Sequence, residues 1–300
     1  MKSRVSIVAP LLVACAVSAY AATLTSGATT TTTSVTTSAV ALPAPTATAT
    51  PVAQPTPVAL AGTTTTTTTA SAPVALAKLP PLDLSDMRLW NYAGKWHASE
   101  WASALSFTPW KFARVAKAAN GDVRFTLNST GAPELKAGTG IVAVKDGLWE
   151  TEVTLPTMRS GLVIAPLWLY NNSTRDEIDF EFAGRKGLDV TVHKYVNGLH
   201  LSKTVRLFAG VDMSGQRKRF GIEVSQARGT IRMFVDGVLV HTFDRQTLGF
   251  FPTSEFRPLI SMWPARSDWS NFVQWVGKWT PLKTNQQIVL VAHGYGYTAP

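Results

Sequence analysis

Apolar and polar residues alternate along short stretches of the chain after residue 88, and this alternation predicts half-buried β-strands. The clearest example is Val123–Leu127, which follows the turn signal Asn120-Gly121-Asp122 and would bury every second side chain. A further strand is expected where four residues share one face: Trp149, Thr151, Val153 and Leu155. No stretch has the spacing of an amphipathic helix of three turns, so the pattern predicts an all-β fold.

Turn residues divide these strands at short intervals, and one pair of strands has a strong hairpin signal. Ile231–Val235 and Val238–Val240 lie on either side of Asp236-Gly237, a dipeptide typical of two-residue β-turns. Leu259–Trp263 and Ile288–Val291 are expected as further strands, and the last of them can close a sheet. Strands that recur this often without intervening helices favour two antiparallel sheets packed face to face.

The N-terminus reads as an export signal. Two basic residues precede the apolar run Val5–Ala14, and Ala19-Tyr20-Ala21 offers a small-residue cleavage site, so residues 1–21 are predicted to be a signal peptide. Leu12–Cys15 also resembles a bacterial lipobox, whose cysteine is lipidated. Two destinations therefore stay open after export: release into the extracellular or periplasmic space, or a lipid anchor on the membrane through Cys15.

A linker is expected between the signal and the folded domain. Residues 22–79 are rich in Thr, Pro and Ala, and no charged residue occurs between Thr23 and Ala77. Such a composition cannot bury a core, so this segment is predicted to be an extended spacer. One catalytic-sized domain is expected over residues 80–300, and a monomer is expected. Cys15 is the only cysteine, so no internal disulfide can form.

The chain is basic, with 28 Lys and Arg residues against 19 Asp and Glu residues. The basic residues are scattered, and an exported chain with 10 tryptophans suits a saccharide better than a nucleic acid, so no nucleic-acid partner is expected. An anionic glycan stays open as a substrate. Four cations near the acidic motif described next could steer such a chain: Arg175, Arg185, Lys186 and Lys194.

The chemistry is expected in Asp176–Phe182, where acidic and apolar residues alternate. Side chains of a strand alternate between faces, so Glu177, Asp179 and Glu181 would share one face and the apolar residues the other. Three carboxylates in a row repel one another, so stability alone does not explain this spacing. The alternative is an acidic surface strand without a function.

Cleavage of a glycosidic bond needs two carboxyl groups, one at the anomeric carbon and one that protonates the leaving oxygen. Crowding separates the pKa values of neighbouring carboxyl groups, so that one stays protonated while another is ionised. The Cα atoms of Glu177 and Glu181 would lie about 13 Å apart on a flat strand. A retaining pair needs its carboxyl groups about 5–5.5 Å apart, so the motif predicts a concave sheet.

The string D-E-I-D-F-E-F resembles the active-site strand of family 16 glycoside hydrolases, in the branch that holds lichenases and xyloglucan endotransglycosylases. The resemblance implies a concanavalin-like antiparallel β-sandwich, or jelly roll, with a concave catalytic sheet. It also implies that Glu177 is the nucleophile, Glu181 the acid/base and Asp179 an auxiliary carboxylate. The expected activity is hydrolysis of a β-glucan-type polysaccharide.

The same resemblance suggests residues that contact substrate. Thr191-Val192-His193 is similar to the strand beside the catalytic one, which places His193 against Glu181 or the substrate. Trp263 and Trp269 resemble aromatic residues near the sugar face, and Trp168 could stack on a sugar or pack in the core. Arg175 stands where lichenases have a Trp, which changes how a sugar could stack.

Two other functions remain open. A carbohydrate-binding module could use the same sandwich, although pure binding needs aromatic residues rather than three carboxylates. A transglycosylase would use identical catalytic residues and pass the sugar to a second saccharide. No cofactor is expected, because the five His residues lack metal-ligand spacing and no phosphate-binding loop occurs; a structural calcium ion stays open.

Overall fold

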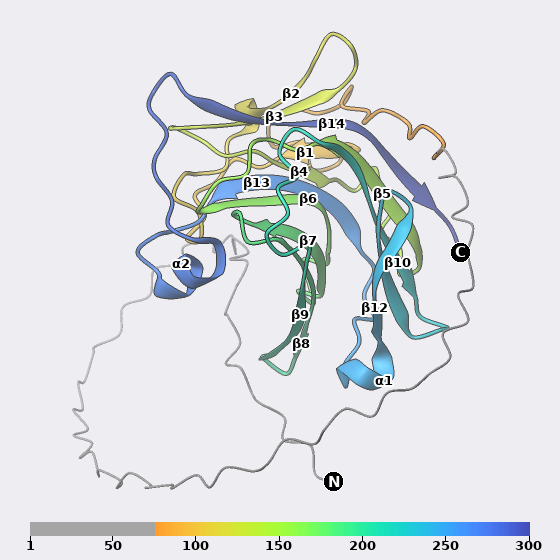
Figure 1. Ribbon diagram of the computed structural model, residues 1–300. Coiled ribbons are helices and arrows are strands. Elements are labelled where there is room, and N and C mark those ends of the chain that lie inside the picture. The colour runs from red at the N-terminus through yellow and green to blue at the C-terminus, as the bar shows by residue number, and fades with distance from the viewer. Residues whose placement is uncertain (1–75) are drawn as a thin grey trace, which may run out of the picture. The chain divides into compact units, whose positions relative to one another are not determined.

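Strands of alternating apolar and polar residues form two seven-stranded sheets in the computed structural model, which describes residues 76–300 (Figure 1). The inner sheet has the spatial order β1 (Trp96–Ala98), β4 (Glu134–Ala137), β13 (Arg257–Pro264), β6 (Leu162–Tyr170), β7 (Glu177–Ala183), β8 (Leu188–Val196) and β9 (Leu199–Leu207). The outer sheet has the order β12 (Val238–Asp244), β11 (Thr230–Val235), β10 (Arg217–Ser225), β5 (Gly147–Thr154), β14 (Gln287–Thr298), β3 (Val123–Asn128) and β2 (Val115–Lys117). The predicted all-β sandwich is confirmed.

Apolar side chains of both sheets meet in one core. In β3 every second residue is buried, as the alternation of Val123–Leu127 predicts, and β5 shows the same pattern. Phe180 of β7 and Phe220 of β10 are fully buried and make an edge contact with ring centroids 5.3 Å apart. Burial of such a side chain contributes about 1.5–3 kcal/mol, so these contacts fix one face of β7 against the outer sheet.

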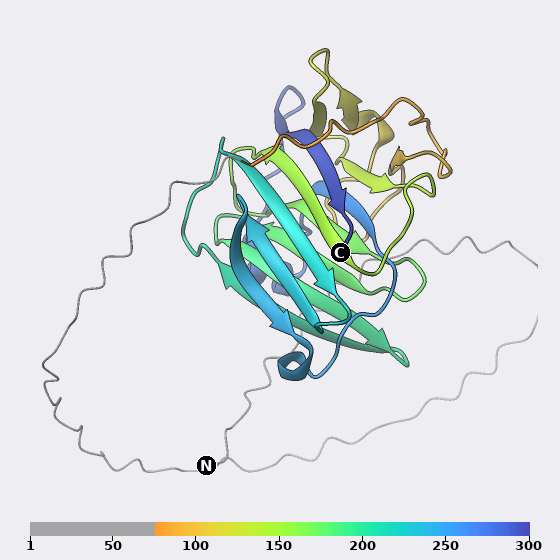
Figure 2. The same ribbon diagram turned by 90° about the vertical axis from the view of Figure 1, so that its right-hand side faces the viewer.

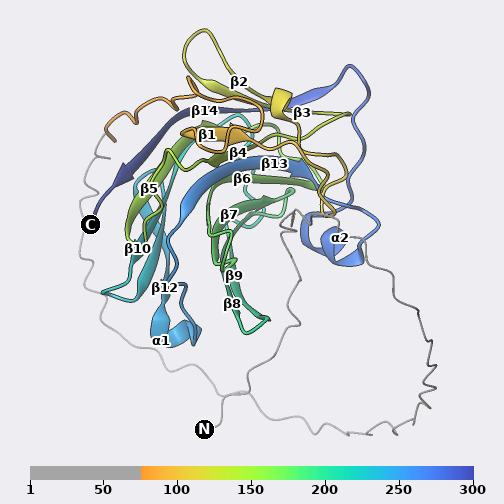
Figure 3. The same cartoon turned by 180° about the vertical axis from the view of Figure 1, so that it is seen from behind.

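The inner sheet is curved, with its concave side turned away from the outer sheet (Figures 1 and 3). The register between β6 and β7 shifts between Ile164 and Leu167, and that between β13 and β6 shifts between Leu259 and Ser261. Such irregularities bend a strand and increase its twist. The bends lie beside β7, so they help to make the concave surface on which this strand is placed.

Two tight turns set the registers of the hairpins. Asp236 and Gly237 have φ angles of 51° and 75°, and Val235 pairs with Val238 across them, which confirms the predicted hairpin. A second hairpin joins β8 to β9 through Asn197-Gly198, whose φ angles are 51° and 81°. Asn, Asp and Gly tolerate positive φ better than other residues, so the residue types at the two central positions favour both turns.

The folded region begins earlier than residue 80. Leu79 and Leu82 are buried, the Ala77 carbonyl accepts a hydrogen bond from Arg219 of β10, and Tyr295 of β14 donates its backbone N–H to Pro80. This segment crosses the outer sheet (Figure 2). Residues 76–79 therefore lie against the domain rather than in the linker, because Leu79 is buried and the Ala77 carbonyl is bonded to β10, contacts that composition alone does not reveal.

Helices are short: α1 (Arg245–Leu248), α2 (Ser270–Val276) and the 3-10 turn η1 (Phe112–Arg114). This agrees with the absence of any long amphipathic pattern. Within residues 76–300 none of the helices has the length and apolar character needed to cross a bilayer. The predicted signal peptide, Cys15 and the linker up to residue 75 lie outside the described residues, and their assignments stay predictions.

Candidate active site

Strand β7 presents the three carboxylates on the concave face of the inner sheet. Ile178, Phe180 and Phe182 point into the core, so alternation turns Glu177, Asp179 and Glu181 to the opposite side. Asp179 is only 1% exposed and Glu177 is 8% exposed, whereas Glu181 is half-buried. The shared face expected for the three acids is confirmed, and the acids are desolvated rather than spread on an open surface.

The neighbouring strands decide what lies beside each acid. On β6, Tyr170 pairs with Glu177 and Trp168 pairs with Asp179. On β8, the partners of Glu177, Asp179 and Glu181 are, in that order, His193, Thr191 and Asp189. Directly opposed residues on antiparallel strands point to the same side, so these side chains surround the carboxylates.

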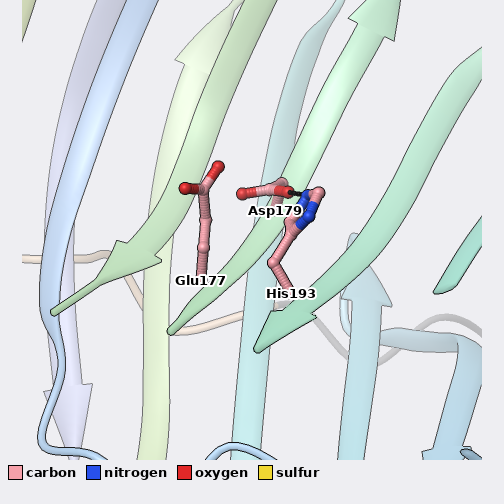
Figure 4. Close-up of side chains that lie close together, drawn as sticks. All are labelled: Glu177, Asp179 and His193. Atoms are coloured by element: carbon pink, nitrogen blue, oxygen red, sulfur yellow. Dashed lines mark ion pairs between the residues drawn. The ribbon is translucent and has the colours of Figure 1, made fainter. Parts of the chain in front are cut away.

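His193 contacts the central carboxylate (Figure 4). Its Nε2 lies 3.0 Å from Oδ2 of Asp179, and its Nδ1 lies 2.9 Å from Nε2 of His200 on β9. The sequence placed His193 against Glu181 or the substrate. The predicted contact with Glu181 is wrong, because the β7–β8 register places His193 opposite Glu177 and Asp189 opposite Glu181.

The contact between the two histidines orients His193. Their ring planes differ by only 12°, and the ring centroids lie 5.1 Å apart. Nδ1 of His200 is buried and has no hydrogen-bond partner among the described residues, which favours the His200 proton on Nε2. His200 then donates to His193, and the His193 proton sits on Nε2, facing Asp179.

Burial controls the protonation of this group. It raises the pKa of Asp179 from 3.8 to about 7, against the lowering effect of a hydrogen bond with Glu177. Burial also raises the pKa of Glu181, and the negative charges of Asp179, Glu177 and Asp189 raise it further. Burial lowers the pKa of His193, which keeps the imidazole neutral. Glu181 therefore keeps its proton to higher pH than an exposed glutamate does, as suits a general acid.

A separate polar cluster fixes Asp189 beside Glu181. Arg206 of β9 donates from Nε and Nη2 to the two carboxylate oxygens of Asp189, each at 2.7 Å. The indole Nε1 of Trp275 on α2 donates to the same carboxylate at 2.7 Å. Because the forked guanidinium contact and the indole both hold Asp189, the charge that raises the pKa of Glu181 has a fixed position.

The three tryptophans predicted to contact sugar lie in different environments. Trp168 lies on the concave face next to Asp179 and packs with Tyr170 and Leu259. Trp263 is 6% exposed and is covered by Phe272 and Trp275 of α2, so its ring packs against the helix. Trp269, at the start of α2, is 41% exposed and stacks on Phe272 with centroids 5.2 Å apart. Sugar contacts by these rings stay predictions.

The cations proposed to steer a substrate do not form one patch. Arg175 is exposed, and its guanidinium lies 5.5 Å from the ring centroid of Tyr195. Lys194 pairs with the buried Asp176 at 3.5 Å. Arg185 and Lys186 follow the other end of β7 and donate to the carbonyls of Met158 and Gln274. The four residues are thus divided between two ends of the strand.

Sequence reasoning missed His200 and Asp189. The hairpin turn Asn197-Gly198 was the available signal for His200, because a two-residue turn there brings His200 opposite Tyr195 and next to His193. No local signal marks Asp189, whose position depends on the pairing of β7 with β8. The spacing of His residues in the sequence did not predict a metal site. In the structure, ligand atoms of Glu177, Asp179 and His193 lie within 4.8 Å of one another and could hold a cation.

The fold is a jelly-roll sandwich, and its concave sheet presents two glutamates around a buried aspartate. These features place the protein in the class of glycoside hydrolases. The sequence profile described as Glycosyl hydrolases family 16 matches residues 106–280. The chain belongs to this family, which confirms the resemblance of the motif. It is therefore an enzyme that acts on O-glycosyl bonds.

Known proteins similar to this chain include two named beta-glucanases. The one from Bacillus licheniformis is 24% identical over 181 residues, which cover 58% of this chain and 70% of that protein. The one from Bacillus subtilis is 24% identical over 159 residues, covering 51% of this chain and 62% of that protein. These similarities are modest.

Solved structures share the fold. The structure of the B. licheniformis beta-glucanase has a TM-score of 0.54 and 21% identity, covering 68% of this chain and 92% of that one. A family 16 enzyme of a Bacteroides ovatus mixed-linkage glucan locus has a TM-score of 0.57 and 15% identity, covering 74% of this chain and 98% of that one. At these identities the comparison supports the fold alone.

Proposed function

We propose that the protein is an exported, retaining endo-β-glucan hydrolase that works by double displacement. The observation that carries this proposal is the geometry of β7, where Glu177 and Glu181 flank a buried Asp179 on a concave sheet. Similarity to two named beta-glucanases favours a β-glucan as the substrate class. Export rests on the sequence of residues 1–21.

In the first step, Glu177 attacks the anomeric carbon of the bound sugar. A bond forms between this carbon and a carboxylate oxygen of Glu177 as the bond to the leaving oxygen breaks. Glu181 gives its proton to that leaving oxygen, which departs as a sugar hydroxyl. The raised pKa of Glu181 favours the protonated form that this step needs.

In the second step, water replaces the enzyme at the same carbon. Glu181, now ionised, takes a proton from water while the water oxygen bonds to the anomeric carbon and the ester bond to Glu177 breaks. Both carboxyl groups return to their starting states. Two inversions at one carbon give net retention of configuration.

Asp179 and His193 control the charge and the surroundings of the two glutamates. With its pKa near 7, Asp179 can share a proton with Glu177 and limit the negative charge around the reacting carbon. His193, held by His200, supplies a fixed neutral neighbour at 3.0 Å on the other side of Asp179. This arrangement separates an acid from a nucleophile although both lie on one strand.

Glu177→Ala tests the assignment of the nucleophile. We expect loss of hydrolysis on mixed-linkage β-glucan, β-1,3-glucan and xyloglucan, whichever of these the unmodified protein cleaves. Added azide should restore part of the activity on an activated aryl β-glycoside and give the α-glycosyl azide, because the small anion replaces the carboxylate. Unchanged hydrolysis in the variant would refute the assignment, and so would a β-glycosyl azide, because retained configuration would mean that another group still acts as the nucleophile.

Transglycosylation is the second candidate, since the same glycosyl-enzyme can be resolved by a sugar hydroxyl instead of water. The products distinguish the two reactions. Hydrolysis gives shorter chains and a steady rise in reducing ends, whereas transfer to an added labelled oligosaccharide gives labelled polymer. A carbohydrate-binding module without catalysis predicts neither outcome.

A further inference from the structure

Two exposed aromatic residues stand on a rigid segment before β1. Trp90 and Tyr92 are each 56% exposed, and their ring centroids lie 6.4 Å apart, so the two rings form one exposed aromatic surface. Asp86 anchors the segment by accepting hydrogen bonds from the Lys95 backbone N–H at 2.9 Å and, through its carbonyl, from Asn91 at 2.9 Å. The loop therefore presents the rings instead of letting them collapse onto the core.

The same segment is tied to the loop after β4. The backbone N–H of Thr139 donates to the Tyr92 carbonyl at 3.0 Å. The backbones approach so closely that a Cβ on Gly138 would lie 2.2 Å from the Gly94 carbonyl oxygen. Trp90 itself has a φ of 65°, a left-handed conformation that a bulky L-residue rarely adopts. Strain of this kind persists where the surroundings hold it, and it is concentrated at functional positions.

Tyr92 stands at one end of a row of side chains that leads to the catalytic carboxylates. Its ring makes an edge contact with His97 of β1, with centroids 4.8 Å apart. Residues paired directly across neighbouring strands then continue the row on the concave face. In spatial order they are His97, Lys136, Leu259, Trp168 and Asp179.

A buried histidine lies at the beginning of this row. His97 is buried, and among the described residues neither of its ring nitrogens has a hydrogen-bond partner. Burial and the charge of Lys136 lower its pKa to about 4, so the neutral ring has one donor and one acceptor. A buried polar group without a partner is costly, and both nitrogens are enclosed in this structure, so the exposed rings rather than His97 provide the surface for sugar.

We propose that Trp90 and Tyr92 form a platform that binds distal glycosyl residues of the polysaccharide, on the face that continues from the active site to β1. The inference rests on the proposed function. The apolar face of a β-linked sugar suits an aromatic ring, and the exposed rings provide that surface. From β1 to β7 there are four strand spacings of about 4.8 Å, or about 19 Å. Only a chain of several sugars can contact the platform and the carboxylates together.

Kinetics on substrates of different length test the platform in the full-length protein. In Trp90→Gly the ring is removed and glycine tolerates the φ of 65°, so the fold should be preserved. We expect KM for the cleaved polymer to rise about two- to tenfold in Trp90→Gly and in Tyr92→Ala. The constants for an aryl β-glycoside too short to reach β1 should not change. Trp90→Phe should restore most of the affinity for polymer.

Leu239→Ala is the matched control, because Leu239 is a large exposed apolar residue in β12 of the outer sheet. It should leave KM for polymer unchanged. The inference is overturned if Trp90→Gly and Tyr92→Ala both keep the original polymer KM. It is also overturned if they lose activity equally on the short and long substrates, since that would show damage to the carboxylate site.

Binding without catalysis separates this inference from the proposed function. In affinity electrophoresis, Glu177→Ala should be retarded by at least one of mixed-linkage β-glucan, β-1,3-glucan and xyloglucan, and adding Trp90→Gly should reduce the retardation. Retardation that depends on Trp90 supports the platform even if the unmodified protein cleaves none of these polymers. No retardation of Glu177→Ala by any of the three would overturn the platform.

Discussion

Asp179→Asn is expected to stabilise the fold at alkaline pH, although Asp179 belongs to the active site. The carboxyl group is 1% exposed, and burial raises its pKa from 3.8 to about 7 in the folded protein. Below pH 3.8 it is protonated in both the folded and the unfolded chain. Between pH 3.8 and 7 the unfolded chain loses this proton and the folded chain keeps it, so the free energy of unfolding falls as pH rises.

The size of the stability change follows from the pKa shift of Asp179. A difference of about 3 pKa units at 1.36 kcal/mol per unit gives about 4 kcal/mol of stability lost by pH 8. Asparagine is neutral at every pH and has nearly the same size and shape as aspartate, so it removes this cost. The negative charge of Asp179 also raises the pKa of Glu181, and its removal therefore acts in the same direction.

Urea unfolding followed by tryptophan fluorescence, at pH 4 and at pH 8, measures the difference between Asp179→Asn and the unmodified protein. The variant should be more stable by about 4 kcal/mol at pH 8 and by less than about 1 kcal/mol at pH 4. The alkaline limb of its kcat/KM profile should move to lower pH, because Glu181 loses a charge that favours its proton. An equal stability difference at both pH values, or a less stable variant at pH 8, would refute the reasoning.

Three further predictions concern the acid, the histidine contact and the N-terminal segment. Glu181→Gln should lose most activity on polysaccharide but keep it on aryl β-glycosides with good leaving groups, which need no protonation; equal loss on both would contradict its role as the acid. His200→Phe should allow His193 to carry its proton on Nδ1, which histidine ¹H–¹⁵N spectra detect, whereas His200→Gln can still donate and should preserve the Nε2–H form. Gly294→Val should destabilise the domain by about 1–3 kcal/mol in urea unfolding, because its Cβ would lie 2.8 Å from the Leu79 Cβ; an unchanged midpoint would contradict the packing of residues 76–79.

Much of the architecture and the chemistry could be predicted from local sequence. Alternation of period two is a property of a single strand, so it placed Glu177, Asp179 and Glu181 on one face before any partner strand was known. The Asp236-Gly237 turn was equally local, because positive φ at two successive positions restricts the residues that fit.

Contacts between strands could not be predicted in this way. The register of β7 with β8 set His193 against Asp179 and Asp189 beside Glu181, and the covering of Trp263 by α2 placed a predicted sugar contact under a helix. Such contacts join segments far apart in the chain, and many registers satisfy the same alternation.

The sequence by itself therefore determined which side chains share a face of β7, since the pleat of a strand depends on that strand alone. Tertiary structure decided which of these side chains are desolvated and which groups touch them. The pKa of Asp179 near 7 and the raised pKa of Glu181 follow from burial between β6 and β8 and from nearby charges, so the division between acid and nucleophile arises only when the strands pair.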